Sequence, residues 1–163
     1  MLFVVGIFDF SGAISLKQKL TNTARESARV AAADPASDLS GSASGVPASV
    51  SDAFWVVDNY LVSEKLGDCG LSSVEPVRSP SSLTWISTAT AAPCGASAAL
   101  MLKINRGCYT PTTINGNTVN LAATCVTIQY PYYWQFGGVS GLTGGTFVGP
   151  TTITVTATAF NEN

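Results

Sequence analysis

The sequence predicts an α+β fold, in which a long N-terminal helix and a second, amphipathic helix pack with an antiparallel β-sheet. Two observations predict the helices: the first 33 residues lack proline and end at Asp34-Pro35, and apolar residues recur at helical spacing between residues 50 and 66. A third observation predicts the sheet, because short β-branched segments alternate with turn residues after Gly67. The expected organisation is a helix over 1–33, a linker over 34–47 and a globular α+β domain over 48–163.

The first helix is expected to run from Met1 to about Ala33. It ends there because a residue that precedes proline is disfavoured in a helical conformation. At about 1.5 Å per residue the helix is about 50 Å long, which is more than a small domain needs for its own core. Its first sixteen residues, MLFVVGIFDFSGAISL, carry one charged side chain, whereas the following seventeen carry five. We therefore expect its N-terminal half to be covered by something outside the chain.

One stripe of this helix combines apolar residues with an acidic one. At about 100° per residue the stripe contains Leu2, Val5, Asp9, Ala13, Leu16, Leu20, Ala24, Ser27 and Ala31. A charge in such surroundings costs about 2.5 to 3.5 kcal/mol on membrane-insertion scales, and Asp9 has no cation within reach on its own helix. We expect Asp9 to contact a cation of another copy, either the Met1 amine or Lys17. The alternative is that the helix begins near a membrane edge and Asp9 reaches out to water.

The second helix is expected after the small, polar linker DPASDLSGSASGVP. Ser49 or Ser51 is the expected N-cap, and Gly67 ends the helix. We expect the helix to cover one face of the sheet, because its apolar residues follow helical spacing: Val50, Ala53, Phe54, Val57, Leu61 and Leu66.

Five strands are expected after Gly67. They are Ser72 to Arg78, Leu83 to Thr88, Ala98 to Asn105, Ala123 to Tyr130 and Thr151 to Phe160. Asn115-Gly116 is a candidate hairpin turn. In the last strand threonines alternate with apolar residues, so one of its faces packs and the other forms a threonine ladder. The glycine-rich residues 136–150 are expected to form a surface loop.

The cysteines indicate disulfides. Cys69, Cys94, Cys108 and Cys125 contain no CxxC motif, and the chain has no histidine to complete a zinc site. Three pairings are open on sequence alone, and four reduced, buried cysteines are the alternative to disulfides. We favour Cys69 with Cys94 and Cys108 with Cys125, because each pair closes a short local loop.

The composition excludes several classes of function. Without histidine the chain lacks the usual general base and the commonest metal ligand, and it has no glycine-rich phosphate-binding motif, so we expect no enzyme, cofactor or metal site. A net charge of −2 offers no basic surface for nucleic acid. Charged residues make up 11% of the chain, compared with about 25% in ordinary soluble domains, and the mean hydropathy is +0.29. We expect a membrane or further copies to cover much of the surface.

The stretch GIFDFSGAISLKQKLTNTARESARVAA, Gly6 to Ala32, resembles the N-terminal signature of TadE-like proteins. These are small pilin-like subunits linked to tight-adherence pili. The acidic residue of the signature is Asp9 and its glycine is Gly12. The helix pattern that follows matches Gln18, Leu20, Asn22, Ala24, Arg25, Glu26, Ala28, Arg29, Ala31 and Ala32. The resemblance implies a pilin-like fold, and an Asp9 that neutralises a neighbouring subunit's terminal amine.

We therefore expect a structural subunit that polymerises through its N-terminal helix into an extracellular helical filament for surface attachment. Its expected partners are copies of itself, the inner membrane before assembly and the pilus assembly machinery. The expected assembly interface consists of Leu2, Val5, Asp9, Gly12, Ala13, Leu16 and Leu20.

Two other functions stay open on the sequence. One is a membrane-anchored minor pilin or initiator of a pilus or secretion machine. The other is a secreted carbohydrate- or surface-binding domain, with Tyr130, Tyr132, Tyr133 and Trp134 as an aromatic platform. Aromatic clusters belong more often to cores or subunit interfaces than to such platforms. For Arg25 and Arg29 we favour a solvated face, with Glu26 and Arg29 paired, over a role in assembly.

Overall fold

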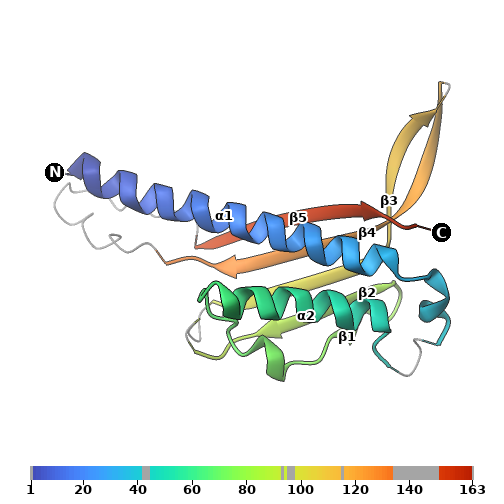
Figure 1. The fold of residues 1–163 in the computed structure, drawn as a ribbon, viewed down its shortest axis with the longest axis horizontal. Coiled ribbons are helices and arrows are strands. Elements are labelled where there is room, and N and C mark those ends of the chain that lie inside the picture. Colours follow the sequence, from blue (N-terminus) through green and yellow to red (C-terminus); the bar gives the residue numbers. More distant parts are fainter. Residues whose placement is uncertain are drawn as a thin grey trace.

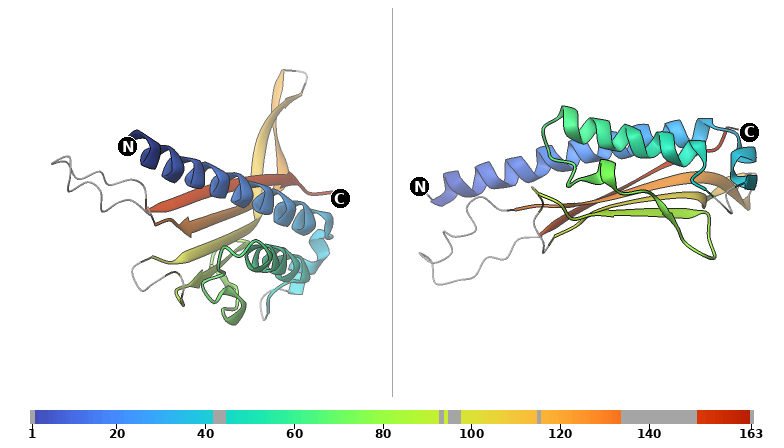
Figure 2. Two further views of the ribbon diagram at one scale, coloured as in Figure 1. Left: turned by 60° about the vertical axis from the view of Figure 1, so that its left-hand side comes forward. Right: turned by 90° about the horizontal axis from the view of Figure 1, so that it is seen from below.

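Two helices lie on one face of a five-stranded antiparallel sheet (Figure 1), so the predicted α+β fold is confirmed. The computed structural model describes residues 2–41, 45–92, 94, 98–114, 116–133 and 151–162, without the side chains of residues 2–6, 41 and 114. Figure 2 shows the two layers from below, with both helices above the sheet.

The first helix, α1 (Leu2–Ala33), is 32 residues long and lies over β4 and β5. The second, α2 (Ala48–Ser63), lies beside α1 and contacts β3. An ion pair of 2.8 Å between Lys19 and Glu64 joins the two helices, and the Glu64 carboxylate raises the pKa of Lys19. The predicted linker contains a short 3₁₀ helix, η1 (Ala36–Gly41).

The predicted cap of α2 is wrong. Its N-cap residue is Pro47, and neither Ser49 nor Ser51 caps the helix with its side chain. Instead the backbone N–H of Ser49 donates to Asp38 Oδ2 at 3.0 Å. A carboxylate from η1 thus satisfies a free donor at the positive end of the helix dipole.

The sheet is a meander in which each strand pairs with the next along the chain, in the order β1-β2-β3-β4-β5. The strands are β1 (Val77–Arg78), β2 (Thr84–Ala89), β3 (Leu100–Ile114), β4 (Asn117–Pro131) and β5 (Thr152–Phe160). The first predicted strand is mostly wrong, because Leu71–Ser73 forms a 3₁₀ helix, η2, and only two residues of β1 pair with β2.

The third and fourth strands continue well past their predicted ends at Asn105 and Ala123. Beyond the sheet they form a two-stranded ribbon over residues 109–122, here called the arm, which projects from the body (Figure 1). Ile114 pairs with Asn117, so the connection has the two-residue length expected for the Asn115-Gly116 turn. Gly116 has a φ of +80°, while Asn115 lies outside the described residues.

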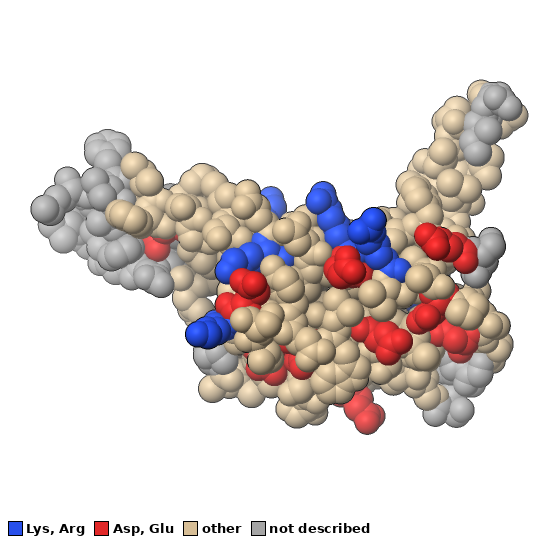
Figure 3. Space-filling view, viewed as in Figure 1, with Lys and Arg blue, Asp and Glu red and all other residues tan. Residues whose placement is uncertain are grey.

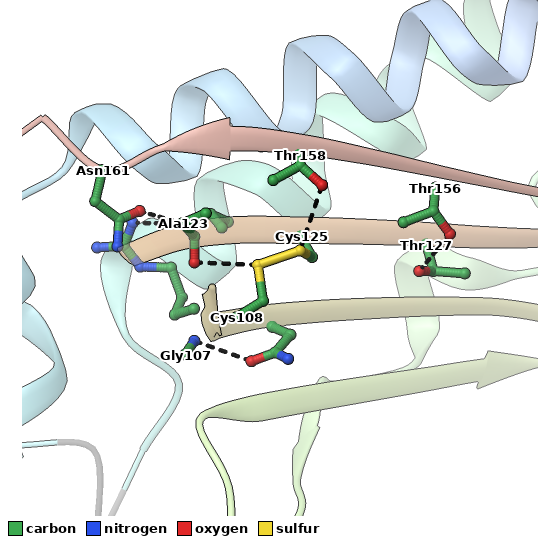
Figure 4. Close-up of a disulfide and its surroundings, with 11 residues drawn as sticks. Gly107, Cys108, Ala123, Cys125, Thr127, Thr156, Thr158 and Asn161 are labelled. Atoms are coloured by element: carbon green, nitrogen blue, oxygen red, sulfur yellow. Dashed lines mark hydrogen bonds between the residues drawn. A yellow bond between two sulfur atoms is a disulfide. The ribbon is translucent and has the colours of Figure 1, made fainter. Parts of the chain in front are cut away.

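The core lies between the helices and the sheet. Trp85, Leu102 and Ile104 from the sheet pack with Val57 and Leu61 of α2. Strand β5 alternates as predicted, since Ile153, Val155 and Ala157 are buried and the threonines between them are exposed. On the open face, the hydroxyls of Thr127 and Thr156 lie 2.9 Å apart across the strands (Figure 4).

Two disulfides join the cysteines in sequential order, Cys69 to Cys94 and Cys108 to Cys125. The first fastens the turn after α2 to the segment after β2. The second crosses from β3 to β4 at the base of the arm (Figure 4), next to the register shift between Asn105 and Cys108. The arm is thus covalently closed where it leaves the sheet.

Candidate assembly surface

The C-terminal two thirds of α1 is part of this chain's own core. Leu16 and Leu20 are buried against the sheet and α2, and three alanines continue the same buried stripe at Ala24, Ala28 and Ala31. Leu16 and Leu20 are therefore covered within this chain, and a place for them in a subunit interface stays a prediction. The stripe was identified correctly as apolar, but the chain's own β5 and α2 cover it.

The opposite side of α1 is apolar only near its N-terminus, and there it is exposed. The side chains of Ile7 and Phe8 are both 67% exposed, Phe10 is 61% exposed and Ile14 is 44% exposed. We call Ile7, Phe10 and Ile14 the apolar face of α1, whereas Phe8 is exposed on another side of the helix, about 100° or more from each of them. Monomeric proteins rarely expose adjacent large apolar side chains, so such a patch indicates a binding surface.

The geometry of the helix explains why this face is left uncovered. At about 100° per residue, Ile7, Phe10 and Ile14 lie within about 60° of one another, and they are about 80° to 180° away from the buried Leu16 and Leu20. The N-terminal turns of α1 also extend past the described ends of β4 and β5 (Figure 2). In the view of Figure 3, basic side chains gather over the middle of the molecule, whereas the N-terminal part of α1 shows few charged atoms.

Asp9 faces the other way from this surface and is 8% exposed. Its backbone carbonyl accepts a hydrogen bond of 2.9 Å from the hydroxyl of Tyr132, the residue after β4. Burial, and to a smaller extent the charge of Asp9, raises the pKa of Tyr132. A contact between the Asp9 carboxylate and a cation of another copy would first require Asp9 to be uncovered, and it stays a prediction.

The other predicted interface residues are placed differently. Gly12 is exposed, but a Cβ there would lie 3.3 Å from Tyr132 Oη, so its small size serves a contact within the chain. Ala13 is half-buried against the core. Leu2 and Val5 lie in α1, and their side chains are outside the described part of the chain.

The tyrosines of the predicted aromatic platform make internal contacts. Tyr130 Oη donates to the carbonyls of Leu66 and Gly67, the latter at 3.0 Å. Tyr132 Oη donates to Asp9, and Tyr133 Oη to the carbonyl of Cys94. These hydroxyls tie the end of β4 to α1, to the turn after α2 and to the disulfide-bonded Cys94. Trp134 lies outside the described residues.

Arg106, which the sequence did not single out, fixes the C-terminal end of α1. The residue is 2% exposed. Its guanidinium donates to the carbonyls of Ala31 and Asp34 and to the hydroxyl of Thr124, at 2.9 Å to Asp34 and 3.1 Å to Thr124. A cation at this position also complements the negative end of the helix dipole. Its only signal in the sequence is a lone arginine inside a strand.

The basic residues of α1 behave as expected on a solvated face. Arg25 is exposed, and Arg29 lies 4.0 Å from Glu26, which confirms the predicted pairing. Within the described residues, neither helix unites enough length with enough apolar sequence to span a bilayer.

Comparison with known proteins finds a family match at the N-terminus of the chain. Neither curated proteins nor solved structures match the chain. Residues 1–29 match the family described as TadE-like protein. The match covers the apolar face of α1, Asp9 and the arginine-containing turns. The match is to a family linked to tight-adherence pili, and it covers 29 residues of the chain. Over these residues the chain is similar to TadE-like proteins, in agreement with the resemblance of its N-terminal sequence.

Proposed function

We propose that this chain is a structural pilin, which polymerises through the apolar face of α1 into an extracellular filament that attaches cells to surfaces. One observation carries the proposal: a helix whose C-terminal part is fixed in its own domain presents Ile7, Phe8, Phe10 and Ile14 uncovered at its other end. The α1 helices of neighbouring copies are the occupants that this face fits best. A contact between unlike surfaces of identical subunits generates an open helical filament when the rotation from one copy to the next does not close into a ring.

The gain from covering this face is large enough to drive association. Fully burying one such side chain is worth about 1.5 to 3 kcal/mol, so the exposed fractions of Ile7, Phe10 and Ile14 correspond to about 3 to 5 kcal/mol per copy. Association costs reduce this figure in a dimer. In a filament each copy has several neighbours, and the contacts add.

The same face suits the step before assembly. An apolar helix end can lie in the inner membrane until pilus assembly machinery transfers it to the filament, where neighbouring copies replace the lipid. Small residues on α1, such as Gly12 and Ala13, are placed close to Tyr132 and the chain's own core, so the exposed aromatic and branched side chains carry the proposed contact.

The alternatives are weaker but testable. A minor pilin or initiator would use the same face, and the two differ only in abundance in the filament. The carbohydrate-binding alternative needs free aromatic faces and hydroxyls, whereas Tyr130, Tyr132 and Tyr133 use their hydroxyls within the chain.

A triple substitution tests the proposal. Ile7→Ser, Phe10→Ser and Ile14→Ser together remove the apolar face from exposed positions, so the fold should survive while filaments disappear from sheared surface material. The matched control replaces three exposed polar residues further along the same helix, Gln18→Ser, Asn22→Ser and Arg25→Ser, and should keep its filaments.

Three results would count against the proposal or modify it. Wild-type yields of filament from the apolar-face triple variant would contradict it. Equal loss in the control would show that any change on α1 acts through the fold. A wild-type filament that contains this chain only in traces would favour the minor pilin.

A further inference from the structure

The outer edge of β5 is open for pairing with another strand. Tyr132 donates its N–H to the carbonyl of Thr151 at 2.9 Å, and Asn161 donates to the carbonyl of Ala122 at 3.2 Å. In an antiparallel ladder hydrogen-bonded pairs alternate with non-bonded ones, so Ile153 and every second residue after it bond to β4. The residues between them direct their backbone N–H and C=O groups outward: Thr152, Thr154, Thr156, Thr158 and Phe160.

This edge lacks the features that natural edge strands use against pairing. Strand β5, TITVTATAF, has no charged residue and no proline, and its register with β4 is uninterrupted. The opposite edge of the sheet, β1, is only two residues long. Among the described residues no backbone hydrogen bond reaches the outer edge between Thr152 and Phe160. A long, uncharged edge of this kind is a site for strand addition.

There is open space beside the C-terminal half of this edge. A cavity of about 630 Å³ lies between α1 and the end of β5. Arg25, Arg29, Ala32 and Ala33 form its helical wall, and residues 158–162 form the other side. An incoming strand would therefore meet β5 on one side and α1 on the other.

The arm carries a second open edge in the same molecule. Because the Ala122 carbonyl points to the β5 side, the outward groups of Thr118 and Asn120 point there too. Strand β5 ends at Phe160, opposite Ala123, so it leaves these groups unpaired. The arm's other edge contains Pro111, which has no N–H to donate.

The arm also needs a partner for its own stability. It has no charged residue from Tyr109 to Ala122, and Tyr109 and Val119 are exposed. The disulfide closes its base, and beyond that point the arm is held by the pairing of two strands. A two-stranded ribbon is at best marginally stable in water.

We propose that the arm of one copy adds along the outer edge of β5 in the next copy, by backbone hydrogen bonds from Thr118 and Asn120. A second copy is the occupant, because every copy supplies both open edges and neither edge carries charge that would oppose the other. The two edges are different surfaces, so the contact propagates as an open chain of subunits. The inference rests on the proposed self-assembly, but it concerns a surface separate from the apolar face of α1.

Hydrogen exchange resolved to single residues tests it directly. Assembled filaments are compared with the same chain dispersed in mild detergent. The outward amides of Thr154, Thr156, Thr118 and Asn120 should exchange at least ten times more slowly in the filament. The amide of Val155, already bonded to β4, is the internal reference. Filaments in which the four outward amides exchange as fast as in the dispersed chain would overturn this inference alone, whereas failure to form filaments would overturn the proposed function and this inference with it.

A pair of variants gives an independent test. Thr156→Pro removes one outward N–H and leaves the β4-facing groups of its neighbours intact, whereas Thr156→Val keeps the N–H and loses the same hydroxyl. We expect the proline variant to raise the critical concentration for assembly at least tenfold and the valine variant to resemble wild type. Asn120→Pro, set against Asn120→Val, repeats the test in the arm, away from the core. Equal assembly within both pairs would overturn the inference.

Discussion

Replacing Arg106 with methionine should lower the free energy of unfolding by about 3 to 5 kcal/mol, the cost observed when one partner of a buried charged cluster is removed. Methionine matches the length of arginine but donates no hydrogen bond. The carbonyls of Ala31 and Asp34 and the hydroxyl of Thr124 then lose their donor, at about 1 to 3 kcal/mol for each buried group left unsatisfied.

Part of this loss is offset, because the variant no longer buries a charge. Burial lowers the pKa of Arg106, and the charges of Asp38 and Asp34 oppose that shift. The substitution removes the desolvation cost of the guanidinium together with its hydrogen bonds. The expected loss of stability is therefore smaller than the summed cost of the three unsatisfied groups. In a chain of this size the expected loss corresponds to a decrease of about 6 to 20 °C in Tm.

Urea denaturation of the full chain in mild non-ionic detergent, followed by circular dichroism, measures this loss. Arg29→Met is the matched control, because the Arg29 side chain is 77% exposed and its ion pair with Glu26 is 4.0 Å long. It should change stability by less than about 0.5 kcal/mol. Arg106→Lys should also be destabilised, since lysine lacks the planar fork that reaches three acceptors. A loss below about 1 kcal/mol for Arg106→Met would refute the role assigned to this residue.

Three further predictions concern the fold. Leu20→Ala should cost about 2 to 5 kcal/mol in urea denaturation and Ile7→Ala almost nothing, because only Leu20 is buried. Burial and the charge of Asp68 raise the pKa of the buried Asp58. The free energy of unfolding should therefore fall as the pH rises from the pKa of Asp58 in the unfolded chain through its higher pKa in the folded chain. If the Asp58→Asn variant showed the same dependence of stability on pH as wild type, this prediction would be contradicted. Replacing both Cys108 and Cys125 with serine should cost about 3 kcal/mol and speed hydrogen exchange in the arm; unchanged exchange would show that the disulfide does not hold it.

The elements that the sequence predicted well are those with one buried face. Helix α2 and strand β5 each show the period of their secondary structure, since every second or every third to fourth side chain enters the core. The arm shows no such period, because those of its side chains that the structure describes are exposed or half-buried on both faces and its ends are set by pairing alone. The same reasoning explains why β1 is shorter than predicted: both of its residues are exposed, so no buried face extends the strand.

The sequence predicts an interface along the stripe of α1 that the chain itself buries, whereas the exposed apolar side chains lie on another side of the same helix. The stripe through Leu16 and Leu20 is apolar in the sequence, and a sequence does not distinguish cover by the chain's own sheet from cover by another copy. The exposed stripe had a weaker signal: it is apolar at Ile7, Phe10 and Ile14 and becomes polar at Gln18. This short apolar stretch lies in the part of α1 that extends past its own domain.

A density map of the assembled filament tests the central claim most directly. If the apolar face of α1 holds the copies together, Ile7, Phe10 and Ile14 will pack against the α1 helices of neighbouring copies. A filament in which these side chains face open solvent, or a purified chain that stays monomeric without detergent at high concentration, would contradict the account.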